Sequence, residues 1–238
     1  MTSSMAAAQA RANVIFDFDL TLFPEESTVS LIKALIHGDE NLTRFLDEYK
    51  DTQKSLKKKI SSAKNYISII SKIKKTSLKN FADSCRTAIN PIFSDLIVDL
   101  KTAGIKPHVI SSGYTEIISP FINDLGIPNE DIAANRLLWA GNQALCIMPS
   151  VLNGAKGKVE VVRRWKASGK IKGPVIMVGD GQADRNVYLH GLADAFIQAN
   201  YYKKSGTHGL RGNFSISESP ESLKQQLSEL LEKIGSNS

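Results

Sequence analysis

Along most of the 238-residue chain, short apolar segments typical of buried strands alternate with amphipathic segments typical of helices. The strand-like segments are VIF at 14–16, KPHVIS at 106–111, VIMVG at 175–179 and ADAFIQA at 193–199. The helical segments lie at 91–104, 115–126, 156–167, 183–192 and 219–234. This alternation predicts an α/β fold, a Rossmann-like doubly wound parallel sheet with helices on both faces.

Two further stretches are interpreted from their turn residues. The segment 132–148 reads as a strand pair that turns at Gly141 and Asn142. The segment 201–213 is rich in glycine and basic residues, and we expect an exposed connection there rather than a phosphate cradle.

A long all-helical region interrupts the alternation after the first strand. Residues 24–90 are rich in lysine and carry helical spacings without a strand signal. We therefore expect a small helical cap domain at 24–90, inserted into a catalytic core made of residues 14–23 and 91–238. Residues 1–13 are expected to form a flexible tail.

Composition narrows the class of protein and its partners. The net charge is +6 and the hydrophobic share 42%, which favours small anionic partners over nucleic acid. No apolar run reaches the roughly 20 residues that a membrane-spanning helix needs. Cys85 and Cys146 are far apart in sequence, so we expect buried free thiols in a reducing compartment and a cytoplasmic location. The lysine run at 54–60 is interpreted as a solvated helix face.

Acidic residues follow two of the predicted strands. Asp17 and Asp19 come directly after the first strand, and Asp180 follows VIMVG. Because ligands bind at the carboxyl ends of parallel strands, we expect these side chains to converge at one edge. Asp17 and Asp180 can share a hard divalent cation, and Mg²⁺ is the natural candidate because it prefers oxygen ligands and bridges carboxylates to phosphate.

Groups that bind anions are expected at the same edge. Ser111 and the backbone amides of Ser112 and Gly113 end another strand and precede a helix, which suits an oxyanion site. Lys156 and Lys158 begin a further helix, and we expect Lys156 to face inward and neutralise phosphate charge. Asp184, one helical turn after Asp180, is expected to orient that lysine. These groups together point to phosphoryl transfer.

In their order and spacing, these segments resemble the motifs of the haloacid dehalogenase superfamily. The matching elements are DFDLT at 17–21, the strand that ends at Ser111, the helix at Lys156 and GDGQAD at 179–184. The resemblance implies that Asp17 is a nucleophile that forms an aspartyl phosphate, and that Asp19 is the general acid and base. It also implies that the Asp19 backbone carbonyl joins Asp17 and Asp180 around Mg²⁺.

Within that superfamily the chain resembles phosphoserine phosphatases. The resemblance rests on the small cap, ANRL at 134–137 and AKGKV at 155–159. It implies that Glu26 lies near a substrate amine and that Lys57 occupies the position of an arginine that binds the substrate carboxylate. Lysine offers a point charge there instead of a planar fork.

Three functions stay open at this level. The first is a Mg²⁺-dependent phosphatase that acts on a small phosphorylated metabolite, with phosphoserine as the leading candidate. The second is a phosphotransferase that passes the same phosphoryl group to an acceptor hydroxyl. The third is a noncatalytic module whose basic cap binds nucleic acid or an acidic partner. The sequence does not determine the oligomeric state.

Overall fold

The computed structural model describes residues 12–35, 69–204 and 212–236. Within these residues a six-stranded sheet has the order β3-β2-β1-β6-β7-β8, and each neighbouring pair is parallel. Its strands are β1 (Ala12–Phe16), β2 (Ile105–Tyr114), β3 (Ile132–Asn135), β6 (Val175–Gly179), β7 (Ala195–Ala199) and β8 (Phe214–Ser217).

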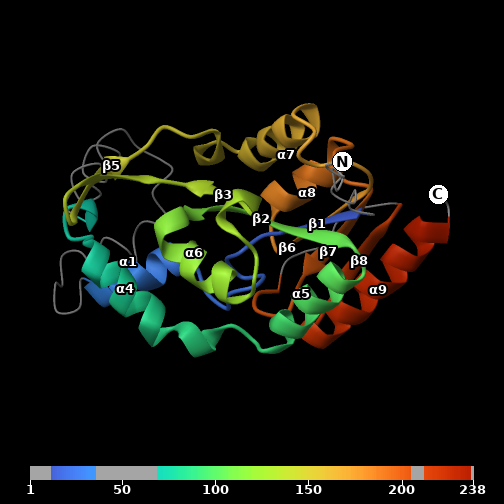
Figure 1. Ribbon diagram of the computed structural model, residues 1–238, viewed down its shortest axis with the longest axis horizontal. Coiled ribbons are helices and arrows are strands. Elements are labelled where there is room, and N and C mark those ends of the chain that lie inside the picture. Colours follow the sequence, from blue (N-terminus) through green and yellow to red (C-terminus); the bar gives the residue numbers. More distant parts are fainter. Residues whose placement is uncertain (1–11, 36–68, 205–211, 237–238) are drawn as a thin grey trace, which may run out of the picture.

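Helices cover both faces of this sheet, as Figure 1 shows. One face packs against α5 (Ile92–Thr102), α6 (Thr115–Asp124) and α9 (Pro220–Ser236), and the other against α7 (Gly157–Ala167) and α8 (Gln182–Leu189). Successive strand residues point to opposite faces, so Val14 and Phe16 enter the first layer whereas Ile15 enters the second. The predicted Rossmann-like α/β fold is confirmed.

The strand pair expected at 132–148 is only partly present. Its first residues form β3, which joins the main sheet next to β2. The hairpin consists of β4 (Leu137–Ala140) and β5 (Gln143–Ile147), joined at Gly141 and Asn142. β8 was not predicted, because its four residues FSIS lack a long apolar run. The described residues also contain three short 3₁₀ helices: η1 (Arg86–Ala88), η2 (Asn129–Asp131) and η3 (Val151–Asn153).

The described part of the predicted cap is helical, with α1 (Ser27–Leu35) and α4 (Lys75–Ser84). These helices contact each other, and both contact α6 of the core. Most of the rest of the cap, residues 36–68, lies outside the described residues, so the division into core and cap stays a prediction. The last two residues of the tail predicted at 1–13 belong to the sheet, since β1 begins at Ala12.

The cysteine prediction is wrong in one respect. Both thiols are free, but Cys85 is half-buried and Cys146 is exposed. Cys146 pairs across the hairpin with Leu138, which is 46% exposed, so this face of β4 and β5 is open to solvent. None of the described helices is long and apolar enough to span a membrane.

A buried polar pair ties the first two strands together. His108 on β2 is fully buried, and its Nε2 lies 3.1 Å from Asn13 Oδ1 on β1. Its Nδ1 lies 3.3 Å from the carboxylate of Asp131. Burial lowers the pKa of His108 to about 4, so the ring is neutral near pH 7.

Candidate active site

A tight turn places the DFDLT motif at the edge of the sheet. The Asp17 N–H donates to Val178 O at 2.8 Å, which continues the β1–β6 ladder. Leu22 and Phe23 then donate to Phe18 O, both at 2.9 Å, and close the turn. Leu20 has a φ of 57°, a left-handed conformation that costs a leucine about 1 kcal/mol or more. This strained turn carries Asp17 and Asp19 beyond the end of β1.

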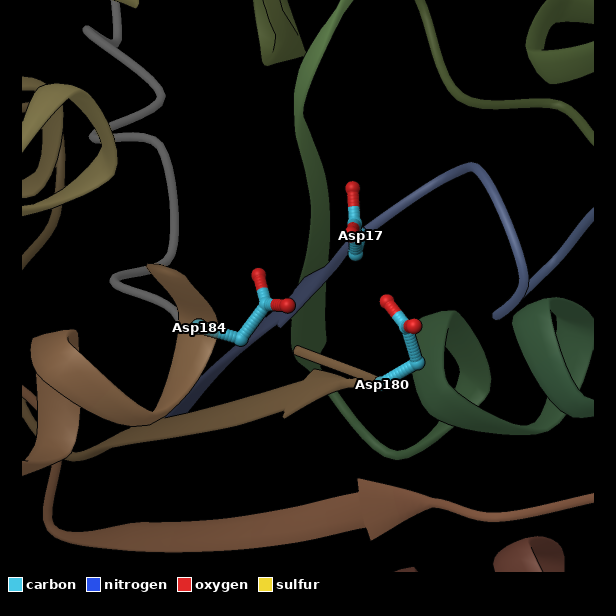
Figure 2. A group of neighbouring side chains, drawn as sticks. All are labelled: Asp17, Asp180 and Asp184. Atoms are coloured by element: carbon cyan, nitrogen blue, oxygen red, sulfur yellow. The ribbon is translucent and has the colours of Figure 1, made fainter. Parts of the chain in front are cut away.

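Three carboxylates meet beyond the strand ends. Figure 2 shows Asp17 after β1, Asp180 after β6 and Asp184 on α8. One oxygen from each lies within 4.8 Å of the others. The expected convergence of Asp17 and Asp180 is therefore present, and Asp184, which was expected to contact the lysine and the substrate, also lies in this group.

The lysine inside this cluster is Lys158. Its Nζ lies 2.7 Å from Asp17 Oδ1 and 2.6 Å from Asp184 Oδ1. The expectation that Lys156 faces inward is wrong. Lys156 is the exposed N-cap of α7, and Lys158 follows on the buried first turn of that helix. The expectation that Asp184 orients the active-site lysine holds for Lys158.

Burial and mutual repulsion control the protonation of the cluster. Burial raises the pKa of Asp17 well above its ordinary value, and the neighbouring Asp184 raises it further. The same two causes raise the pKa of Asp180 to about 6. Burial alone would lower the pKa of Lys158, but Asp17 and Asp184 outweigh it and raise the pKa above its ordinary value. The Lys158 ammonium therefore stays protonated. One ammonium does not balance three carboxylates, so a further positive charge would stabilise the ionised forms of Asp17 and Asp180.

Asp19 is held by the start of α1. The Ser27 N–H donates to Asp19 Oδ1 at 2.8 Å. Burial raises the pKa of Asp19, while the bonds from Ser27 act in the opposite direction. A carboxyl group with a raised pKa is suited to give and take a proton. Glu26, next to Ser27, is exposed and close enough to raise the pKa of both Asp19 and Asp180.

The strand that ends at the predicted oxyanion site is longer than expected. β2 continues past Ser111 to Tyr114, with an irregular register after Ile110. The Gly113 N–H donates to Ser111 Oγ at 2.9 Å. A side chain built on Gly113 would place its Cβ 3.4 Å from Asp19 Oδ2, so this segment lies next to the Asp19 carboxylate. Ser112 is exposed and its carbonyl accepts from Asn135.

Comparisons with known proteins agree with this geometry. The family model for haloacid dehalogenase-like hydrolases matches residues 14–187, well over half of the chain. The chain belongs to this family. The match runs from β1 to α8 and therefore contains Asp17, Lys158, Asp180 and Asp184.

Named relatives of this haloacid dehalogenase-like hydrolase are phosphoserine phosphatases. The chloroplastic enzyme of Arabidopsis thaliana is 31% identical over 126 residues, which cover 50% of this chain and 41% of that protein. The Drosophila melanogaster enzyme is 23% identical over 199 residues, which cover 81% of this chain and 72% of that protein. The chain thus spans less than half of the Arabidopsis relative. The resemblance expected from the motifs is confirmed.

A solved structure supports the fold. A phosphoserine phosphohydrolase-like protein from Francisella tularensis superimposes with a TM-score of 0.64 at 24% identity. The superposition covers 92% of this chain and 99% of that chain. The shared fold spans the sheet whose strand ends carry the carboxylates.

The cluster of Asp17, Asp180 and Asp184 is suited to bind a hard divalent cation. Asp184 is already engaged, because Oδ1 accepts from Lys158 and Oδ2 accepts from the Gly181 N–H at 3.1 Å. Asp17 Oδ1 accepts from the Phe18 N–H as well as pairing with Lys158. Among the described residues, no hydrogen bond reaches Asp17 Oδ2 or the carboxylate oxygens of Asp180. These oxygens are therefore suited to bind an ion.

A second lysine, on the segment after β7, lies near the carboxylates. Lys203 Nζ lies 4.0 Å from Asp180 Oδ2, and the Tyr201 hydroxyl donates to Thr21 O at 2.9 Å. This segment was predicted to be an exposed connection, and its basic composition was the one signal in the sequence for a charge near the site. Lys57 lies outside the described residues.

A wide cleft lies away from these groups. It encloses about 840 Å³ between α4, α6 and β3, and none of the site carboxylates lines it. The candidate active site is therefore the place where these side chains converge, and not the widest cleft.

Proposed function

We propose that this haloacid dehalogenase-like hydrolase is a Mg²⁺-dependent phosphatase of a small phosphomonoester. The observation that carries the proposal is the cluster of Asp17, Asp180 and Asp184, whose oxygens lie within 4.8 Å of one another around buried Lys158. A phosphate dianion would be repelled by these carboxylates unless cations offset them.

In the first step, an oxygen of Asp17 attacks phosphorus and forms an aspartyl phosphate. The bond between phosphorus and the substrate oxygen breaks, and its electrons stay on that oxygen. Asp19 starts this step protonated and gives its proton to the leaving alcohol. Its raised pKa, caused by burial, supports this role.

In the second step, Asp19 acts as the base. It takes a proton from water while the water oxygen attacks phosphorus. The bond to Asp17 breaks and inorganic phosphate is released, which returns Asp17 to a carboxylate and Asp19 to an acid. Lys158 stabilises the negative charge that develops on the phosphoryl oxygens, as buried donors do in transition states.

Asp17 and Asp180, with the backbone carbonyl of Asp19, are the groups proposed to hold Mg²⁺. When bound, the ion supplies Lewis-acid polarisation and neutralises phosphoryl charge. Ser111 and the adjoining amides are proposed to contact the phosphate. For Gly113, this requires its N–H to leave Ser111 Oγ.

Phosphoserine is the leading substrate. The names of the relatives support this choice, and so does Glu26, an exposed carboxylate beside the site that is suited to bind an ammonium group. Location in the cytoplasm stays a prediction. The noncatalytic alternative rests on lysines at 54–59, which lie outside the described residues.

The test is phosphate release from O-phosphoserine and a panel of small phosphate esters, with Mg²⁺ and with a chelator. We expect turnover that requires the metal and that Asp17→Asn abolishes. Asp95→Asn, an exposed carboxylate on α5, is the matched control and should keep wild-type activity. Undiminished hydrolysis by Asp17→Asn would refute the nucleophile assignment.

The same assay separates hydrolysis from transfer. With homoserine added as an acceptor, a phosphatase still releases inorganic phosphate. A phosphotransferase instead yields phosphorylated acceptor at the expense of free phosphate.

A further inference from the structure

We propose that Lys203 binds the carboxylate of the substrate and thereby selects phosphorylated amino acids over phosphorylated amines or alcohols. The proposal rests on the proposed phosphatase function and names its substrate class. It assigns carboxylate recognition to the segment after β7, whereas the family resemblance had pointed to Lys57 in the cap.

The segment that carries Lys203 is fixed to the active-site turn. Tyr201 donates its hydroxyl hydrogen to Thr21 O, and its ring packs against Phe93 with centroids 6.4 Å apart. Tyr202 stacks edge-on against Tyr201, with centroids 4.9 Å apart. These contacts hold the backbone next to the DFDLT turn, so Lys203 stays within reach of the site.

The charge of Lys203 is available to a ligand. Lys158 is buried and already bonded to two carboxylates. Lys203 has a side chain that is 57% exposed and is 4.0 Å from Asp180, which is too long for a hydrogen bond. Among the described lysines and arginines, only these two form ion pairs with the three clustered carboxylates. A metal ion held by Asp180 would offset the charge of this carboxylate, which would leave the Lys203 ammonium available to a substrate anion.

Lys203 and Glu26 place opposite charges at the same site. Lys203 Nζ lies 4.0 Å from Asp180 Oδ2, and Glu26 directly precedes Ser27, whose N–H donates to Asp19 Oδ1 at 2.8 Å. An amino acid carries one ammonium and one carboxylate, which match this pair of charges. O-Phosphoethanolamine has the ammonium and phosphate of O-phosphoserine but lacks the carboxylate, so the two esters isolate the proposed contact.

The adjacent residue provides a matched control. Lys204 is 73% exposed and pairs with Glu218 instead of a site carboxylate. An exposed pair of this kind contributes little to stability. Lys204→Ala therefore removes the same charge from the same segment without touching the site.

The experiment measures kcat and KM for both esters with wild-type protein, Lys203→Ala, Lys203→Arg and Lys204→Ala. For Lys203→Ala we expect the phosphoserine-to-phosphoethanolamine ratio of kcat/KM to fall about tenfold, mainly through KM, as expected for a lost ion pair. Lys203→Arg should recover most of the ratio, and Lys204→Ala should stay within about twofold of wild type. Thermal unfolding of each variant checks that the fold is intact.

The outcomes separate this inference from the proposed function. If neither ester, nor p-nitrophenyl phosphate, is hydrolysed by the wild type, the phosphatase proposal itself fails. If the wild type is active and the ratio is unchanged in Lys203→Ala, the assignment of Lys203 is overturned while the phosphatase proposal stands. An equal fall in Lys204→Ala would also overturn it, because the effect would then come from general charge.

Discussion

In the variant Lys158→Met, an uncharged side chain of similar length replaces the ammonium that bridges Asp17 and Asp184. The wild-type Nζ lies 2.7 Å and 2.6 Å from their oxygens, and the lysine is only 5% exposed. Removing one partner from a buried ion pair costs about 3–5 kcal/mol, because the remaining charge has no compensation. Lys158 has two such partners, which increases the expected loss. Burial of its own ammonium opposes folding, and its removal offsets part of that loss.

We expect a loss of about 3 kcal/mol in the free energy of unfolding at pH 7.5 without metal. The loss should be about 1 kcal/mol at pH 5, because carboxylates with a raised pKa take up protons when folded and lose their repulsion. The sign follows from the protons bound: the folded variant holds protons that the unfolded chain releases above pH ~4, so its stability falls as pH rises.

The assay is urea unfolding at both pH values, with Lys156→Met as the matched control. Lys156 is exposed and forms no ion pair within the described part of the chain, so its replacement should change stability by about 0.5 kcal/mol or less. Turnover should fall by about 100-fold or more in Lys158→Met only. Equal effects of the two variants, or a larger effect at Lys156, would refute the assignment of the buried cation.

Three further predictions follow from the same geometry. Because the pKa of Asp180 is raised to about 6, the metal-free protein should lose stability as pH rises from ~4 to ~6. In Asp180→Asn, the free energy of unfolding at pH 7.5 should rise by about 1–2 kcal/mol after allowance for solvent screening, and Mg²⁺ should no longer raise the Tm. Gly179→Ala would place a Cβ 2.2 Å from Asp184 Cγ, so displacement of Asp184 should reduce kcat at least about 100-fold while circular dichroism stays native. The pKa of His108 is lowered to about 4, so the unfolded chain takes up a proton at a higher pH than the folded protein does. The free energy of unfolding should therefore fall as pH drops from ~6.5 toward ~4, and urea unfolding of His108→Gln should not show this fall.

The strand ends were predictable because their chemistry is local in the sequence. An apolar run followed by Asp17 or Asp180 identifies both the strand and the edge where it ends. The choice between Lys156 and Lys158 was not predictable in this way. It depends on where α7 begins, and a shift of two residues turns a helical side chain by about 200°.

Contacts between distant segments were also beyond the sequence. The bond from Ser27 to Asp19 depends on how α1 leaves the active-site turn, and the approach of Lys203 to Asp180 depends on how Tyr201 packs. β8 could not be predicted for a similar reason. FSIS has little intrinsic signal, and it becomes a strand because β7 offers an unpaired edge beside it.

The strand order has a consequence for synthesis of the chain. β1 lies between β2 and β6, so its first neighbour arrives only at Ile105 and its second only at Val175. During translation the residues that carry Asp17 must wait for most of the polypeptide before both flanks exist. Asp17 and Asp180 can thus come together only late in synthesis, and a nascent chain that stops before Val175 lacks the proposed catalytic centre.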